Sequence, residues 1–158
     1  MHMLINANAP KLKFLQHNSA EFREYYRECI MAYVRLPKDT IEPAVKGFCD
    51  KLFASGVAVS TYSCEGHIEA DDIYVTGSYV GFIVVDLQMQ LHIAGRLQYL
   101  NGLLYEMYGH EGGFELEMDL STPTENTCVP DLVVRPPVFA SLKQRDEWWA
   151  FVTKNFKV

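Results

Sequence analysis

Thiol, carboxylate and imidazole groups follow one another in the stretch Ser63–His67, which reads Ser-Cys-Glu-Gly-His. The stretch ends a β-branched run that starts at Val57, and the acidic segment Glu69–Asp72 comes directly after it. Gly66 can adopt a positive φ, so the backbone can turn sharply there and direct successive N–H groups into one concavity. These residue types therefore predict a functional site at the end of a strand.

Cys64 and His67 are the candidate catalytic residues of this stretch. Their spacing lets a turn bring them close enough to share a proton, with Cys64 as a thiolate nucleophile and His67 as its base. The same pair is also half of a zinc site. The residues that would complete the zinc site are His110, His92, Cys49 or an acidic residue of 69–72. Strong zinc signatures contain two close Cys/His pairs and this chain has one, so we assign no metal ligand from sequence.

A third interpretation is a binding loop, in which hydroxyl groups and turn amides hold a small polar ligand. The candidate ligand-binding residues of this loop are Ser60, Thr61, Tyr62, Ser63, Glu65 and Gly66. Either Tyr62 or Tyr79 would line the pocket. In the remaining, purely structural interpretation, Cys64 is packed in the interior and Gly66 only makes a turn.

The same positions resemble a motif of the wybutosine-synthesis tRNA methyltransferase family, Thr-x-Ser-Ser-Cys-Ser-Gly-Arg. The matching residues are Ser60, Thr61, Ser63, Cys64 and Gly66, within a resemblance that extends over residues 40–85. It implies a pocket for S-adenosylmethionine and RNA at the strand end, and S-adenosylmethionine as a cofactor is implied by this resemblance only. Two positions differ from the family, because its arginine is His67 here and its serine before the glycine is Glu65. The resemblance therefore extends to the geometry of a site and not to an RNA substrate.

Composition excludes several classes of protein. The formal net charge is −6 and no dense lysine or arginine run occurs, which argues against nucleic-acid partners and anionic membranes. No apolar run is long enough to cross a bilayer. The four cysteines show no close pairing, and the first ten residues lack the basic head and apolar body of a signal peptide. These features predict a cytoplasmic protein with reduced thiols.

Apolar spacing predicts the elements that must position the site. Helices are expected from an Asn18/Glu21 capping box to before Pro37, from about Thr40 to Ser55, over Met89–Tyr108, and from Ser141 through Val152. Strands are expected over Val57–Cys64, Tyr79–Val85, Phe114–Leu120 and Leu132–Arg135. The order ααββαββα predicts a single α+β domain over residues 1–158, built on a mainly antiparallel four-stranded sheet with packed helices.

Two classes of function follow. The first is a small enzyme or ligand-binding protein, methyltransferase-like by resemblance, that takes a small molecule at the Ser-Cys-Glu-Gly-His turn. The second is a non-enzymatic acidic module, an inhibitor or adaptor, that binds a protein partner. Its surface would be strand 114–120, with Phe114, Leu116, Met118 and Leu120 facing inward and acidic residues facing outward, or the exposed member of Trp148–Trp149. Adjacent helical residues point about 100° apart, so one tryptophan should pack and the other border the surface.

Overall fold

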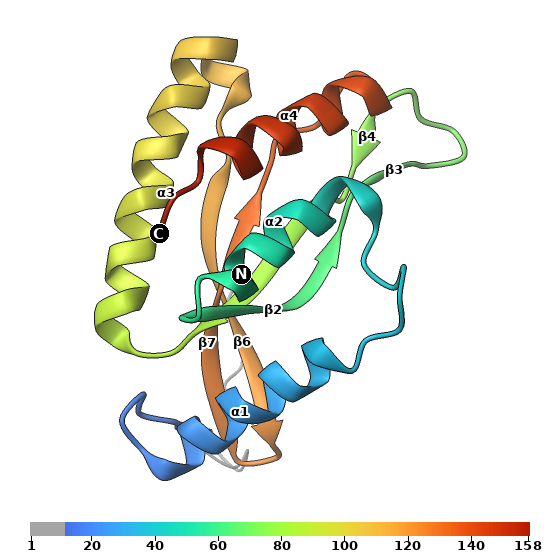
Figure 1. Cartoon of the computed structure of the whole chain (residues 1–158). Helices are drawn as coiled ribbons and strands as arrows, with labels where there is room; N and C mark the ends of the chain where they lie inside the picture. Colours follow the sequence, from blue (N-terminus) through green and yellow to red (C-terminus); the bar gives the residue numbers. More distant parts are fainter. Residues whose placement is uncertain (1–11) are drawn as a thin grey trace, which may run out of the picture.

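A computed structural model describes residues 12–158 of the chain (Figure 1). The segment on which the absence of a signal peptide was predicted lies outside these described residues. The α-helices are α1 (Ala20–Val34), α2 (Pro43–Ala54), α3 (Leu87–Tyr108) and α4 (Leu142–Asn155), with a short 3₁₀ helix, η1 (His110–Gly112). No helix in the described part of the chain combines the length and the apolar character that a membrane crossing requires.

The main sheet contains the four expected strands and one short addition. Its strands are β1 (Lys13–Phe14), β2 (Ala58–Cys64), β5 (Tyr79–Val84), β6 (Glu115–Thr124) and β7 (Thr127–Arg135). β2, β5, β7 and β6 lie side by side in that order and all three pairings are antiparallel. β1 adds parallel pairing to the beginning of β7, so the sheet is mixed, and the predicted α+β class is confirmed. A separate hairpin, β3 (His67–Ile68) and β4 (Val75–Thr76), follows the candidate turn.

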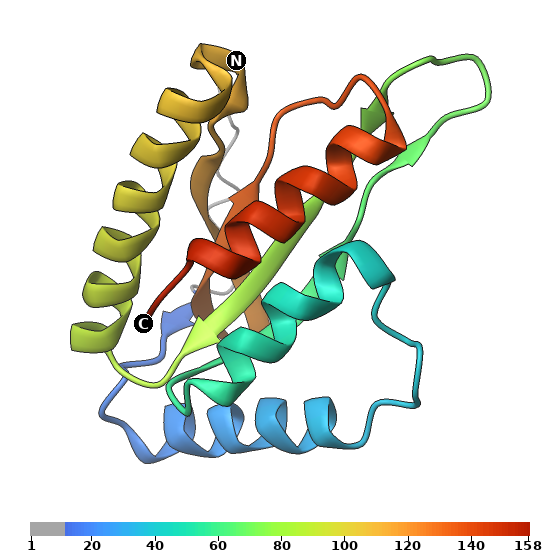
Figure 2. The same cartoon turned by 45° about the horizontal axis from the view of Figure 1, so that its top comes forward.

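The helices cover the two faces of the sheet unequally. α2 and α4 lie side by side over one face with α3 along their flank, whereas α1 crosses the opposite end of the molecule (Figures 1 and 2). The larger core therefore forms between three helices and one face of the sheet, and includes Phe48, Leu52, Phe82, Leu97, Leu104, Val134 and Trp149. α1 packs on strand residues that alternate with these, among them Val59, Ile83 and Val129. One face is thus buried along most of its length, and the other is covered by α1 near one end.

The first helix begins one residue later than the capping-box spacing predicts. The N-cap is Ser19, whose hydroxyl accepts a hydrogen bond from the backbone N–H of Phe22. Asn18 is not the cap, since its backbone carbonyl accepts from the Arg23 side chain. Serine and asparagine cap helices about equally well, so spacing alone does not distinguish these two neighbouring residues.

The prediction for the tryptophan pair is wrong, because both side chains are buried: Trp148 is 3% exposed and Trp149 is 0% exposed. α4 lies between two elements and not on one surface. Trp149 packs against Phe48 of α2, while Trp148 packs against Phe114 and donates its indole N–H to the Gly112 carbonyl at 2.8 Å. Directions 100° apart on the helix therefore both point into protein.

The inward side of β6 is only partly buried, which also differs from the expected half-buried strand. Phe114 is 4% exposed, but Met118 is 62% and Leu120 is 48% exposed. β6 is an edge strand, and Leu116 is the last of this alternating set that packs against the main core. Alternation along a strand shows which side chains share a face, and it does not show how far a helix covers that face.

Candidate functional site

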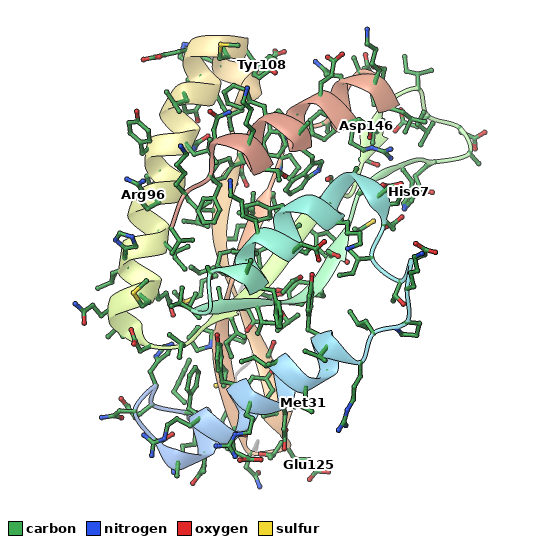
Figure 3. All side chains as sticks on the ribbon, viewed as in Figure 1. Met31, His67, Arg96, Tyr108, Glu125 and Asp146 are labelled. Carbon is green, nitrogen blue, oxygen red and sulfur yellow. The ribbon has the colours of Figure 1, made fainter. Side chains whose placement is uncertain are left out.

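The Ser-Cys-Glu-Gly-His turn connects the end of β2 to the β3–β4 hairpin. Gly66 has a φ of 87°, and this left-handed conformation sends the chain back toward the helices. A Cβ atom on Gly66 would lie 3.0 Å from Ser78 Cβ and 3.1 Å from the Thr76 carbonyl oxygen, so only glycine fits there without a shift. The reversal places His67 beside the beginning of α2 (Figure 3).

Glu42, Cys64 and His67 form a cluster of possible metal ligands on the outer side of this turn. One carboxylate oxygen, the thiol sulfur and one imidazole nitrogen all lie within 4.8 Å of one another. His67 Nε2 is 2.8 Å from Glu42 Oε2. The Glu65 backbone N–H donates to Glu42 Oε1 at 3.2 Å, and the Gly66 N–H donates to Cys64 Sγ at 3.5 Å. Three different donor types therefore converge from α2, β2 and β3.

Glu42 is the member of this cluster that sequence reasoning missed. It precedes Pro43, which begins α2, and occupies the N-cap position without making a side-chain capping bond. Its carboxylate is consequently available to the turn. None of His110, His92, Cys49 and the acidic residues of 69–72, named from sequence as completing ligands, joins a cluster of three among residues 12–158. A glutamate before a helix-starting proline is a weak signal, since many helices begin that way.

Glu65 and Gly66, on the inner side of the turn, are engaged in holding the fold together. Glu65 Oε2 accepts from the Ala44 N–H at 2.9 Å and thereby caps α2, while Glu65 Oε1 lies 3.4 Å from Arg145 Nη1. The same Arg145 nitrogen donates to the Gly66 carbonyl at 2.8 Å, and Arg145 is only 7% exposed. This buried arginine therefore joins α4 to the turn and, through Glu65, to the start of α2.

The structure does not bring the predicted binding-loop hydroxyls together. A register shift in β2 between Ser60 and Tyr62 divides the hydroxyls between the two faces of the sheet. Ser60 and Ser63 face α2, where they oppose the rise in pKa that burial causes in the Cys49 thiol, and the Ser60 hydroxyl donates to the Gly81 carbonyl at 3.2 Å. Thr61 and Tyr62 face the other side and donate to Asp131 and Asp119, each at 3.2 Å.

The groups around Cys64 act on the pKa of its thiol in opposite directions. Burial raises the pKa of the Cys64 thiol, and although the Gly66 N–H opposes this, the Glu42 carboxylate raises the pKa further. A nucleophilic cysteine needs the reverse, a positive surrounding that lowers the pKa and favours the thiolate. A bound metal ion, by contrast, removes the thiol proton itself. Together with the convergence of three donor types within 4.8 Å, this favours metal ligation over thiolate catalysis.

A second polar group, Asp131, lies under α1 on the opposite face of the sheet. Its side chain is 0% exposed; Oδ2 accepts from the Thr61 and Ser121 hydroxyls, and Oδ1 has no hydrogen-bond partner within residues 12–158. Burial raises the pKa of Asp131, opposed in part by those two hydroxyls. Sequence reasoning missed this residue because a lone acid in an apolar strand gives no spacing to interpret.

Tyr62 and Tyr79 pack on one another near the same face, with ring centroids 5.7 Å apart. Gly81 leaves the space that the Tyr62 ring occupies, since a Cβ there would come within 2.4 Å of it. The Arg135 guanidinium lies 5.4 Å from the Tyr79 centroid and pairs with Glu117. The pocket-lining role expected for these tyrosines remains a prediction.

Comparisons of the chain with protein-family models, with curated proteins and with solved structures returned no match. The resemblance to wybutosine-synthesis methyltransferases, and the S-adenosylmethionine it implies, therefore stay sequence predictions.

Proposed function

We propose that the protein binds a divalent transition-metal ion of the zinc class through Glu42, Cys64 and His67, and that this centre is its ligand-binding or enzymatic site. The observation that carries the proposal is the convergence of a carboxylate oxygen, a thiol sulfur and an imidazole nitrogen within 4.8 Å. Cysteine, histidine and glutamate are the usual protein ligands of zinc. The proposal keeps the function at the Ser-Cys-Glu-Gly-His turn, where the residue types predict it.

The present distances are close to those that a tetrahedral zinc ion needs. Zinc bonds of about 2.3 Å to sulfur and about 2.0 Å to nitrogen place neighbouring donor atoms roughly 3.5 Å apart. The 2.8 Å between His67 Nε2 and Glu42 Oε2 must open slightly, and the spread of up to 4.8 Å within the cluster must close by about an ångström. Side-chain rotations of this size leave the backbone in place.

Backbone groups already orient two of the three ligands. The Glu65 N–H holds the Glu42 carboxylate, and the Gly66 N–H points at Cys64 Sγ. Such outer contacts fix ligand orientation in metal sites. The His67 side chain is 56% exposed, so a fourth coordination position would open toward solvent. Three protein ligands with one open position is the arrangement of catalytic zinc, in which the metal polarises a bound water or substrate oxygen.

Titration with Zn²⁺ and Co²⁺ tests this proposal. We expect one tightly bound ion per chain and, with Co²⁺, a thiolate-to-metal charge-transfer band. Cys64→Ser should abolish that band, and His67→Gln and Glu42→Gln should each lower the affinity roughly 10- to 100-fold or more. The matched controls Cys29→Ser, His92→Gln and Glu28→Gln, all outside the cluster, should bind like the wild type. Equal affinity in the cluster variants and the controls would refute the site.

A second candidate function, the acidic interaction module, is favoured by the exposed edge of β6. Within the described residues β6 pairs only with β7, so one edge of a ten-residue strand carries free backbone groups. Glu115, Glu117 and Asp119 alternate on one side, and exposed Met118 and Leu120 lie on the other. This edge fits an extended partner segment in which basic and apolar residues alternate, added as a further strand.

A synthetic peptide of alternating lysine and valine tests this second function, with a glutamate–valine peptide as its counterpart. We expect the basic peptide alone to bind, measured by fluorescence anisotropy. Charge reversal by Glu115→Lys and Glu117→Lys should remove the binding, whereas Glu106→Lys on α3 should not. Equal binding of both peptides, or indifference to the reversals, would exclude the β6 edge as the surface.

A further inference from the structure

A hollow of about 510 Å³ lies at the end of α3, and none of the three candidate metal ligands lines it. It is bordered by η1, by the segment that leads into α4, by α4 itself and by the loop of the β3–β4 hairpin. The aromatic side chains on its surface are those of Tyr74, Tyr108, Phe139 and Trp148. Tyr108 lies at the C-terminal end of α3, beside α4 (Figure 3).

The floor of this aromatic hollow is rigid. Phe139 and Trp148 are 1% and 3% exposed, and their ring centroids are 5.7 Å apart. The Trp148 indole N–H is fixed by the Gly112 carbonyl, and the Phe139 backbone pairs with Val75 through two hydrogen bonds of 2.9 and 3.1 Å. These two rings form a fixed base beneath the hollow, and the aromatic surface that a ligand would contact belongs mainly to Tyr74 and Tyr108.

The rim of the hollow is aromatic and negatively charged. Tyr74 and Tyr108 are 48% and 43% exposed, and the carboxylates of Glu111 and Glu147 border the same space. Glu147 forms an ion pair with Lys143 on α4, with 3.6 Å between Oε1 and Nζ. Glu111 makes no ion pair within residues 12–158. No lysine or arginine of the described part of the chain lines the hollow. The carboxylates on this rim would repel an anion and attract a cation.

We propose that this hollow binds an alkylammonium group, quaternary or multiply methylated. Aromatic rings attract such cations through their negatively charged faces, and the apolar methyl groups fill space that a strongly hydrated ammonium or metal ion cannot. The nearby carboxylates add charge complementarity without requiring a hydrogen-bond donor. The group could belong to a free choline-like molecule or to a methylated lysine of a peptide, and both sources present the same chemistry. This site shares no residue with the proposed metal centre, although Tyr74 and His67 belong to the same hairpin.

Titration of the full chain with choline and with its neutral isostere, 3,3-dimethyl-1-butanol, tests the proposal. We expect choline to change the fluorescence of the tryptophans and to bind at least tenfold more tightly than the isostere, which has the same shape without the charge. A trimethyllysine peptide compared with its unmethylated form decides whether a peptide is the better source. Equal binding of choline and the isostere would overturn the proposal, and so would the absence of binding by both choline and the trimethyllysine peptide.

Two substitutions test whether choline binds in the hollow. Tyr74→Leu, on the exposed hairpin loop, and Glu111→Gln should each weaken choline binding roughly fivefold or more. Tyr99→Leu and Glu106→Gln are the matched controls, because both residues are exposed on α3 and neither borders the hollow. The melting temperature of each of the four variants should be measured to check that the variant is folded. Unchanged choline binding in the Tyr74 and Glu111 variants would also overturn the proposal.

Discussion

The two sides of the Ser-Cys-Glu-Gly-His turn differ in how their polar groups are used. On the inner side, Glu65 and Gly66 engage Arg145, which is 7% exposed, and Glu65 also caps α2. On the outer side, Cys64 and His67 meet Glu42 where His67 keeps 56% of its side-chain surface exposed. Neighbouring residues of one short motif therefore belong to two different environments.

The inner-side groups are therefore expected to stabilise the fold, and the outer-side groups to bind a ligand. A buried charged group whose partners are all within the chain is costly to disrupt, because losing one partner leaves the other desolvated and unpaired. A partly exposed group with unused bonding capacity contributes little to folding and remains available to a ligand. We therefore expect substitutions on the inner side to affect unfolding, and substitutions on the outer side to affect metal binding.

The largest effect should follow Arg145→Ala. Removing the guanidinium leaves the Glu65 carboxylate, whose side chain is 15% exposed, without its cation and the Gly66 carbonyl without its donor, at a cost of about 3 kcal/mol in the free energy of unfolding. Urea denaturation measures it. The double variant Arg145→Met with Glu65→Gln should lose less free energy of unfolding than the losses of its two single variants added together, because the two side chains are coupled. A loss below about 1 kcal/mol for Arg145→Ala would mean that the inner side is not structural.

Gly66→Ala should have the next largest effect. Its φ of 87° and the contacts a Cβ would make with Ser78 and Thr76 predict a loss of about 2–3 kcal/mol by urea denaturation. Gly95 supplies the matched control, since a Cβ there meets nothing within 4 Å and the residue lies in α3. Gly95→Ala should instead stabilise by about 0.5–1 kcal/mol. Equal effects at both positions would contradict the geometry of the turn.

Asp131 is a buried acid, and its Oδ1 has no hydrogen-bond partner within residues 12–158. Because burial raises its pKa in the folded state, the stability it contributes is present below the ordinary carboxyl pKa and lost as the pH rises through the raised value. An asparagine side chain does not titrate, so Asp131→Asn should gain stability relative to the wild type, on the order of 1 kcal/mol, between acidic and neutral pH. A pH series of urea melts measures this. A constant difference across the series would show that Asp131 does not titrate in this range.

The smallest effects on the metal-free protein should come from His67→Gln and Cys64→Ser. The His67–Glu42 contact is partly exposed, so each change should alter the unfolding free energy by less than about 1 kcal/mol. Zinc at a hundred times its wild-type dissociation constant should stabilise the wild type by about 2.7 kcal/mol, and should stabilise both variants by roughly 1.5 kcal/mol or less because they bind zinc more weakly. Thermal melts with and without zinc measure both quantities. Large losses without metal would place the outer side among the structural contacts.

The elements and their order could be predicted from the sequence alone. Helical spacing placed α2 and α3 to within a few residues, and the run over Tyr79–Val84, apolar on both faces, marked the strand that lies between β2 and β7. The turn at Gly66 could also be predicted, since this residue has the positive φ expected of it. These features depend on residues that are close in the chain, and local periodicity records them directly.

The meeting of polar groups, by contrast, depends on how the elements pack. Arg145 reaches the Gly66 carbonyl across 79 positions, and Glu65 meets Glu42 across 23. The burial of Trp148 and the exposure of Met118 depend likewise on which faces α4 and the other helices cover. Periodicity specifies the face on which a side chain lies, but the neighbours of that face are set by the tertiary arrangement. For that reason the motif could be located from sequence, while its division into a structural side and a binding side required the fold.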